Sequence, residues 1–357
     1  MIKDQQLKYE SNLEEILNQI SKDGKYIEQN DLIQINYFGN KQDLNNLNNI
    51  EKIENQGRDE NKNKYLVGKY KDIYIGCLSI NNPESREKFG LNKYFNDKFY
   101  IGQWNDNKKE GIGFLKVKDD IFYLGQFSNN QLNGFGMLLY KDKGYFYFGT
   151  FIDGQIDKGI FYDNEKSLFY NGKFKDGKKN DNLCTYFDIN NKNIFIGEVK
   201  DDNFIRGYLS LCEINEEKKD NQILTNFSCD RVIYFDKSDT NNPIYKHHYY
   251  FENDFADSLQ NVFMEIFEVD LNIRDIHDNY VAFFENLENI IYNDSYTDYT
   301  ERYNPQDNFN IENSFIKNYN IYYNRFIQSQ EKFNLKKYED IIKEEPKIDK
   351  SLKIEIK

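Results

Sequence analysis

The chain has 357 residues, a length typical of two or three folding units, which excludes a mini-protein that depends on disulfides or metals for its stability. It carries 60 acidic and 47 basic side chains, so its formal net charge at pH 7 is −13. This charge disfavours unassisted capture of nucleic acid or of an anionic membrane by the whole chain, and we expect no nucleic-acid partner.

The first 64 residues predict a cap and a linker. Ser11 and Glu14 fit a capping box at the start of a short amphipathic helix, and residues 33–38 resemble a strand, so residues 1–39 are assigned to an N-terminal helix and strand cap. Residues 40–64 are almost wholly polar and bury too little apolar area to offset their ordering entropy. We therefore expect a polar linker or loop there.

Residues 65–214 repeat one short unit, namely an aromatic residue, any residue, glycine, any residue and an apolar residue. Its six copies contain Gly76, Gly102, Gly125, Gly149, Gly172 and Gly197. The two best copies add a second pair of glycines at a constant offset, Gly111 with Gly113 and Gly134 with Gly136. A polar turn separates the two glycine segments, so each unit predicts one β-hairpin.

The aromatic residues of each unit predict one shared face. In an extended strand, residues four apart point to the same side, and the glycine between them leaves a socket for a flat-lying ring. A single layer of hairpins cannot cover both faces, so we expect part of this aromatic face to bind a partner. Trp104 is assigned to packing first, with a ligand contact left open. The partner-binding candidates are Tyr100, Trp104, Tyr123, Phe127, Tyr147, Phe151, Tyr170 and Phe174.

The unit resembles the MORN (membrane occupation and recognition nexus) repeat, which reads approximately Tyr-x-Gly-x-Trp/Phe, a turn, and Gly-x-Gly. The resemblance covers about residues 74–210, and it is strongest over residues 100–176. Leu78 replaces the aromatic residue in the first copy, and the last two copies lose the full Gly-x-Gly return. The resemblance implies an elongated, single-layer antiparallel β-hairpin repeat array of about six hairpins. A helical C-terminal region, indicated by the spacing of apolar residues, follows this array.

The rest of the chain predicts a change from strand to helix. Residues 215–253 are assigned to an irregular or strand connection, with a strand at residues 231–235. Apolar residues then follow helical spacing, for example Tyr319, Tyr322 and Phe326, so residues 254–345 are assigned to a helical region. We expect the helices around Tyr280 to close the far end of the array, and residues 346–357 to form a tail.

No pattern in the chain predicts an enzyme, a cofactor or a metal. Gly111 and Gly113 resemble the start of a dinucleotide loop, but the third glycine is missing and the pair recurs with the hairpin period. Residues 270–281 depart from a calcium loop at Asp275 and Val281. The four cysteines have no CxxC spacing, which favours neither a zinc site nor a disulfide framework and fits a reducing compartment; they are Cys77, Cys184, Cys212 and Cys229.

The family resemblance implies a non-enzymatic scaffold in a cytoskeletal or ciliary (axonemal) assembly of the cytoplasm. Its partners would be other proteins, bound as a helix or an extended segment, with a homodimer as a further option. The sequence shows no apolar segment of the roughly 18 residues that would span a membrane. The alternative is a peripheral membrane adaptor that contacts lipid through a local lysine cluster. That cluster consists of Lys173, Lys175, Lys178 and Lys179.

Overall fold

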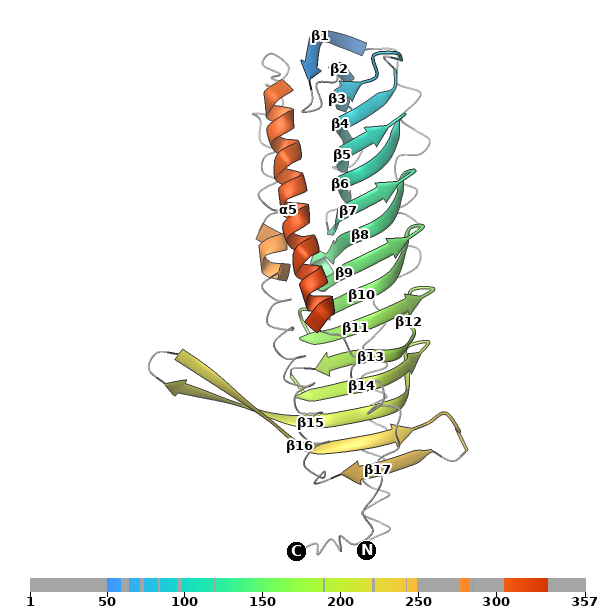
Figure 1. The fold of residues 1–357 in the computed structure, drawn as a ribbon, viewed down its shortest axis with the longest axis vertical. Coiled ribbons are helices and arrows are strands. Elements are labelled where there is room, and N and C mark those ends of the chain that lie inside the picture. Colours follow the sequence, from blue (N-terminus) through green and yellow to red (C-terminus); the bar gives the residue numbers. More distant parts are fainter. Residues whose placement is uncertain are drawn as a thin grey trace, which may run out of the picture.

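In the computed structural model of the chain, residues 50–58, 64–70, 74–82, 84–94, 98–118, 120–188, 190–219, 222–241, 243–248, 276–282, 285 and 305–332 are described. Over these residues, 17 strands form one antiparallel sheet, and two helical segments follow late in the chain. The strands are stacked along the long axis of an elongated molecule (Figure 1). The predicted cap at residues 1–39 and the tail at 346–357 lie outside the described residues.

The strands follow one another across the sheet in chain order. They are β1 (Ile50–Arg58), β2 (Lys64–Tyr70), β3 (Tyr74–Leu78), β4 (Arg86–Lys93), β5 (Phe99–Asn105), β6 (Lys108–Lys118), β7 (Ile121–Ser128), β8 (Gln131–Tyr140), β9 (Tyr145–Ile152), β10 (Gln155–Asp163), β11 (Leu168–Lys175), β12 (Lys178–Lys179), β13 (Asp181–Asp188), β14 (Asn193–Lys200), β15 (Asn203–Lys219), β16 (Gln222–Asp236) and β17 (Ile244–His248). A short 3₁₀ helix, Lys141–Lys143, joins β8 to β9.

The six predicted hairpins are present. They pair β3 with β4, β5 with β6, β7 with β8, β9 with β10, β11 with β12 and β13, and β14 with β15. Within the best hairpins, two residues with positive φ form the turn, such as Asp106 with Asn107 and Asn129 with Asn130. Paired positive φ values define the tight hairpin turn whose twist matches the flanking strands, and Asn and Asp tolerate them.

The sheet continues beyond the predicted array at both ends. Either residues 31–38 or residues 65–70 are expected to pair with the first hairpin as a cap. β2 pairs with β3, whereas residues 31–38 lie outside the described residues. The prediction of a linker over residues 40–64 is wrong for residues 50–58, because these form β1 and pair with β2. Apolar content was a poor guide here, since a strand can satisfy its backbone polar groups by pairing even where its sequence is polar.

Most of the described part of the connection assigned to residues 215–253 is regular strand, one of the two forms expected for it. β15 and β16 pair from Arg206–Asp236 out to Lys219–Gln222, and β16 contains the predicted strand at residues 231–235. In Figure 1 the outer part of this hairpin projects away from the sheet as an arm. Pro243 lies between the end of β16 and the start of β17.

The described helical segments cover a face of the sheet. They are residues 276–282 and α5 (Pro305–Lys332), and α5 runs alongside the stacked strands in Figure 1. Ile276 and Tyr280 belong to the same buried cluster as Phe135 and Phe148 of the sheet. The expectation that Tyr280 helps to close the far end of the array is therefore wrong: this residue packs on a face, where the larger apolar area lies.

Candidate interaction surface

The repeat glycines line up in one column across the sheet, which Cys184 interrupts between Gly172 and Gly197. In the two best hairpins, Gly102 pairs with Gly113, Gly113 with Gly125, and Gly125 with Gly136. The same column includes four further glycines that are not among the repeat glycines above, namely Gly68, Gly90, Gly159 and Gly207. Cross-strand neighbours were the missing signal, because spacing along one strand does not show which residue lies opposite.

Each repeat tyrosine closes over this glycine column. A Cβ added to Gly102 would lie 2.5 Å from the Cα of Gly113 and 2.6 Å from the hydroxyl of Tyr100. The Tyr100 hydroxyl reaches past the glycine and donates a hydrogen bond to the carbonyl of Gln103 at 2.8 Å. The predicted socket is thus confirmed, and the ring is held by its own strand.

This tyrosine bond recurs at the same place in five copies. The hydroxyls of Tyr74, Tyr100, Tyr123, Tyr147 and Tyr170 each donate to the carbonyl three residues later, at 2.8 to 3.0 Å. Burial raises the pKa of Tyr100, Tyr123 and Tyr147 well above the ordinary range, so these phenols stay protonated at neutral pH. The repeat therefore specifies a hydrogen bond as well as a ring.

The two glycines of the Gly-x-Gly return have different roles. Gly113 belongs to the glycine column, whereas Gly111 has a φ of 66° beside a shift in the pairing of β5 and β6. The side chain of Gln103 fills this irregularity, because its Oε1 accepts the backbone N–H of Ile112 at 2.9 Å. Gln126 does the same for the N–H of Phe135 beside Gly134. A left-handed backbone favours glycine, which explains the paired glycines of the motif.

The aromatic rings pack on one another in a ladder, and we call this side of the sheet the ladder face. Tyr123 makes edge-to-face contacts with Phe127 of its own strand at 5.2 Å and with Phe151 of the next hairpin at 5.2 Å. Tyr100 contacts Trp104 and Phe127 in the same way, at 4.9 and 5.1 Å between ring centroids. Such pairs are favourable beyond their buried area.

The ladder face corrects the prediction of an open aromatic surface. All eight partner-binding candidates are buried: Tyr100, Trp104, Tyr123, Phe127, Tyr147, Phe151, Tyr170 and Phe174. Their neighbours on adjacent hairpins occupy the area that a partner was expected to use. Trp104 is also held by a hydrogen bond from its ring N–H to the Gly90 carbonyl at 3.1 Å, so the packing role assigned to it first is the one that the structure supports.

Turns of successive hairpins are tied together on the same edge. The side-chain oxygen of Asn107 accepts the N–H of Arg86, and that of Asn130 accepts the N–H of Lys109, both at 2.8 Å. The backbone N–H groups of these two asparagines donate back to the carbonyls of Arg86 and Lys109. The Arg86 guanidinium lies 4.2 Å from the centre of the Trp104 ring, which shields the end of the ladder.

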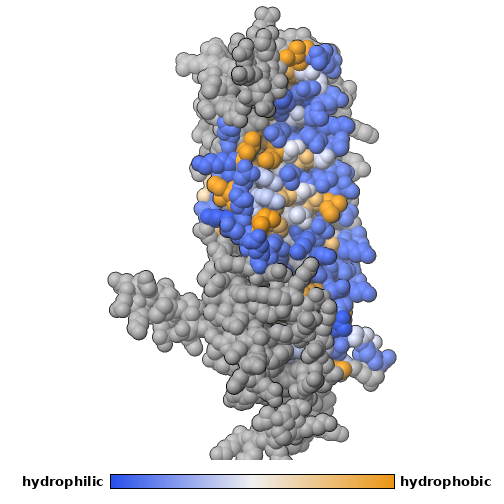
Figure 2. Space-filling view, viewed as in Figure 1, coloured by the Kyte–Doolittle hydropathy of each residue, from blue (hydrophilic) through white to orange (hydrophobic). Residues whose placement is uncertain are grey.

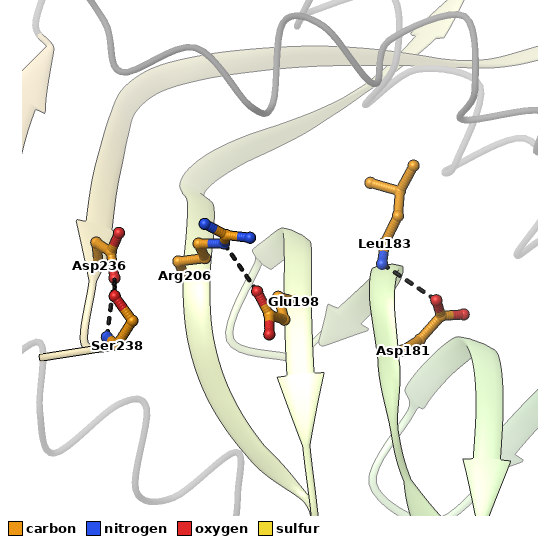
Figure 3. Close-up of polar contacts among 6 residues, drawn as sticks. All are labelled: Asp181, Leu183, Glu198, Arg206, Asp236 and Ser238. Atoms are coloured by element: carbon orange, nitrogen blue, oxygen red, sulfur yellow. Dashed lines mark hydrogen bonds and ion pairs between the residues drawn. The ribbon is translucent and has the colours of Figure 1, made fainter.

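One cross-strand ion pair and two local polar contacts lie in the part of the sheet from β13 to the end of β16 (Figure 3). Arg206 and Glu198 are cross-strand partners of β15 and β14 and form an ion pair at 2.8 Å. Asp181 accepts the N–H of Leu183 at 3.1 Å, and Asp236 accepts hydrogen bonds from the backbone and hydroxyl of Ser238. These partly exposed contacts fix strand ends rather than forming a reactive group.

The opposite side of the sheet is covered by helix, and we call it the helix face. Its central ring, Phe135, contacts Tyr319, Tyr323 and Phe326 of α5 at centroid distances of 5.6, 5.2 and 5.1 Å. Phe148 on the next strand also contacts Phe326, at 5.2 Å. Next to them, the hydroxyl of Tyr280 donates to the Met137 carbonyl at 3.3 Å. The helix face therefore binds helical segments of the same chain.

The surface of the described part is mostly hydrophilic in the view of Figure 2, with hydrophobic residues in separate patches. Among the side chains of α5 that the structure describes, the exposed large hydrophobic ones are Ile321, Tyr323 and Ile327. Of the four lysines predicted to contact lipid, Lys179 is buried, with its ammonium 5.3 Å from the Tyr170 ring centre, so only three are available at the surface.

The described residues show neither a metal-binding group nor a membrane span. No cluster of three or more histidine, cysteine or acidic side chains lies close enough there to hold a metal ion. No described helix combines the length and the apolar content needed to cross a membrane. Cys77 and Cys184 are buried thiols, and burial raises the pKa of Cys184 well above its usual value, which makes a reactive thiolate unfavourable.

Comparison with known proteins identifies the repeats. No curated protein matches the chain. The family model of the MORN repeat matches residues 100–116 and 123–145, the strands on which the glycine column and the ring ladder are most regular. The chain therefore contains MORN repeats at these residues, and MORN repeats are generally non-catalytic modules that interact with proteins or membranes.

Proposed function

We propose that this chain is a non-enzymatic scaffold that binds other proteins through its sheet. The observation that carries the proposal is the helix face, where Phe135 and Phe148 already hold an amphipathic helix. Aromatic side chains give a large contact area with little conformational entropy to lose, which suits the capture of helices. The ladder face is a weaker candidate because its rings are buried against one another.

The proposal includes a place in a cytoskeletal or ciliary assembly. This part rests on the resemblance to MORN repeat proteins alone, and a rigid, elongated sheet is a suitable spacer within such an assembly. A stack of hairpins that are paired in chain order resists bending at any one joint, since each strand is bonded to both of its neighbours. Partners could then be held at fixed separations.

Affinity isolation of the tagged full chain from its own cells, followed by identification of co-purifying proteins, tests the proposal. Tubulin or axonemal proteins would support the cytoskeletal scaffold. Flotation of the purified chain with anionic vesicles, in the absence of any protein partner, would instead support the membrane adaptor. If cells that express the folded chain yield neither tubulin nor axonemal proteins, and the purified chain does not float with vesicles, the scaffold proposal is overturned.

A matched pair of variants makes the isolation interpretable. Gly125→Val places a branched side chain in the glycine column, whereas Asp153→Asn changes an exposed turn residue whose φ of 48° asparagine accepts. Specific partners should be lost with the first variant and kept with the second. Partners that remain bound to Gly125→Val would be contaminants or ligands of the unfolded chain.

A further inference from the structure

The helix α5 is seated on the helix face by one narrow stripe. Tyr319, Tyr322 and Phe326 are each about 5% exposed, and their spacing of three and four residues places them on the same side of a helix. Phe326 makes the deepest contact because it touches Phe135 on β8 and Phe148 on β9. We call the part of the helix face around Phe135 and Phe148 the seat of α5. A helix packs on this seat through aromatic residues at positions i, i+3 and i+7.

A polar contact fixes the position of α5 along the sheet. The residue between the aromatic residue and glycine of each unit is apolar in most copies, such as Leu124 and Phe148, but it is Asn171 in the fifth. Asn171 is buried, and it accepts a hydrogen bond from the side-chain amide of Gln330 at 3.2 Å. A buried polar group is costly without a partner, so a helix that lacks an amide four residues after its last aromatic residue is disfavoured here.

The sequence of α5 is poorly suited to a helix that stands alone. Six of its 28 residues are asparagine, and none is alanine or leucine. Asparagine has low helix propensity, and most helix stability in proteins comes from packing of an apolar face. The opposite side of α5 exposes Ile321 and Ile327, at 42% and 38%. The order of α5 thus depends on its seat on the sheet.

We infer that α5 is a displaceable occupant of a helix-binding site, and that an amphipathic helix of a partner protein binds there in its place. That partner helix carries aromatic residues at i, i+3 and i+7 and a side-chain amide at i+11, the pattern of Tyr319, Tyr322, Phe326 and Gln330. This inference rests on the proposed function as a protein-binding scaffold. It adds to that function the binding site, the side chains required of the partner helix, and the role of α5 as a competitor for the same site.

Competition with α5 lowers the apparent affinity of the site for a partner helix. While α5 is seated, the affinity for a partner helix is reduced by the fraction of molecules in which the seat is open. The tether keeps α5 at a high effective concentration, so a free helix of the same sequence should bind the intact chain weakly. A change that weakens only the seating of α5 should therefore strengthen binding of the partner.

Fluorescence anisotropy of a labelled synthetic peptide of residues 305–332 with the full-length chain provides the test. We expect weak binding to the unchanged chain, and at least roughly tenfold tighter binding to the Phe326→Ser chain, because the tethered competitor is weakened. The matched control is Ile327→Ser, which makes a similar change on the exposed side of the same helix. This control should leave the affinity within about twofold of the unchanged chain.

Hydrogen exchange on the unchanged chain gives a second measurement that needs no folded variant. Saturating unlabelled peptide should accelerate exchange in residues 316–331 while strands β6 to β9 remain protected. Equal affinity for the Phe326→Ser and Ile327→Ser chains, or peptide binding without faster exchange in α5, would overturn the inference. If the peptide does not displace α5, the affinity isolation still tests the proposed scaffold function. If the isolation finds no partner, the peptide measurement still tests the displacement of α5. The two proposals can therefore fail separately.

Discussion

The two faces of the sheet are closed in different ways. On the ladder face, Tyr123 packs against Phe127 of its own strand and Phe151 of the next hairpin, so the repeat covers itself. On the helix face, Phe135 depends on rings from α5, which lies almost 200 residues further along the chain. The ladder face is therefore covered by residues of the repeats themselves, whereas the helix face is covered by a segment outside the repeats.

The largest expected effect is alkaline unfolding that starts at the ladder face. Burial raises the pKa of Tyr100, Tyr123 and Tyr147 well above the unfolded value of about 10, so their contribution to stability is complete below pH 10 and is lost as the pH rises beyond it. Each tyrosine that releases its proton only on unfolding lowers stability by about 1.4 kcal/mol per pH unit.

Absorbance at 295 nm, which reports phenolate, checks this together with circular dichroism. The buried tyrosines should ionise in the same step in which the sheet unfolds, after an early phase from the exposed ones. Smooth titration of all tyrosines near pH 10 with an intact sheet would show that the ladder face is open to solvent.

A substitution in the glycine column should have the next largest effect. Gly125→Val should lower the free energy of unfolding by roughly 3 kcal/mol or more, because the branched side chain collides with the Tyr123 ring and the Gly136 backbone. Asp153→Asn, at an exposed turn position with a φ of 48°, is the matched control and should be close to neutral. Equal melting shifts for Gly125→Val and Asp153→Asn would contradict the socket.

Truncation of the deepest ring of α5 should affect one face only. Phe326→Ala should destabilise the docking of α5 by about 3 kcal/mol, because it leaves a cavity between Phe135 and Phe148. Hydrogen exchange should speed up in residues 316–331 and remain slow in β5 to β8. If β5 to β8 lose protection to the same extent, the two faces are one cooperative unit and the comparison fails.

Removal of one tyrosine hydroxyl should have a smaller effect. Tyr123→Phe keeps the ring contacts but deletes the bond to the Gln126 carbonyl, which should cost about 1 kcal/mol. Chemical denaturation measures this difference. The same change at Tyr323, whose ring contacts Phe135 but which is 40% exposed, serves as the reference and should be close to neutral.

The smallest effect is expected at a buried carboxylate at the end of β10. Burial raises the pKa of Asp163, so its ionised form is disfavoured in the folded state. Its contribution to stability is complete below the unfolded pKa of about 4 and declines as the pH rises through the folded value. Asp163→Asn keeps an acceptor for the N–H of Lys166 and should raise the melting temperature by about 1–2 °C at pH 7, with no gain at pH 3. A gain at both pH values would point to a cause other than ionisation.

The sequence by itself determined the hairpins, because their causes are local. Glycine spacing placed the column of Gly102, Gly113 and Gly125, and polar turn residues placed the positive φ values at Asn107 and Asn130. Helical spacing likewise predicted the stripe of Tyr319, Tyr322 and Phe326. Each of these patterns is written in residues a few positions apart, where backbone geometry alone decides which side chains share a face.

Tertiary structure decided what lies opposite each face. The exposure of Tyr100 or Phe151 depends on rings more than 20 residues away, and the seat of α5 depends on Phe135 and Asn171. The polar strand β1 forms because β2 offers it backbone partners, a reason that its own composition does not contain. Burial and pairing are properties of both partners in a contact, so no single stretch of sequence can specify them.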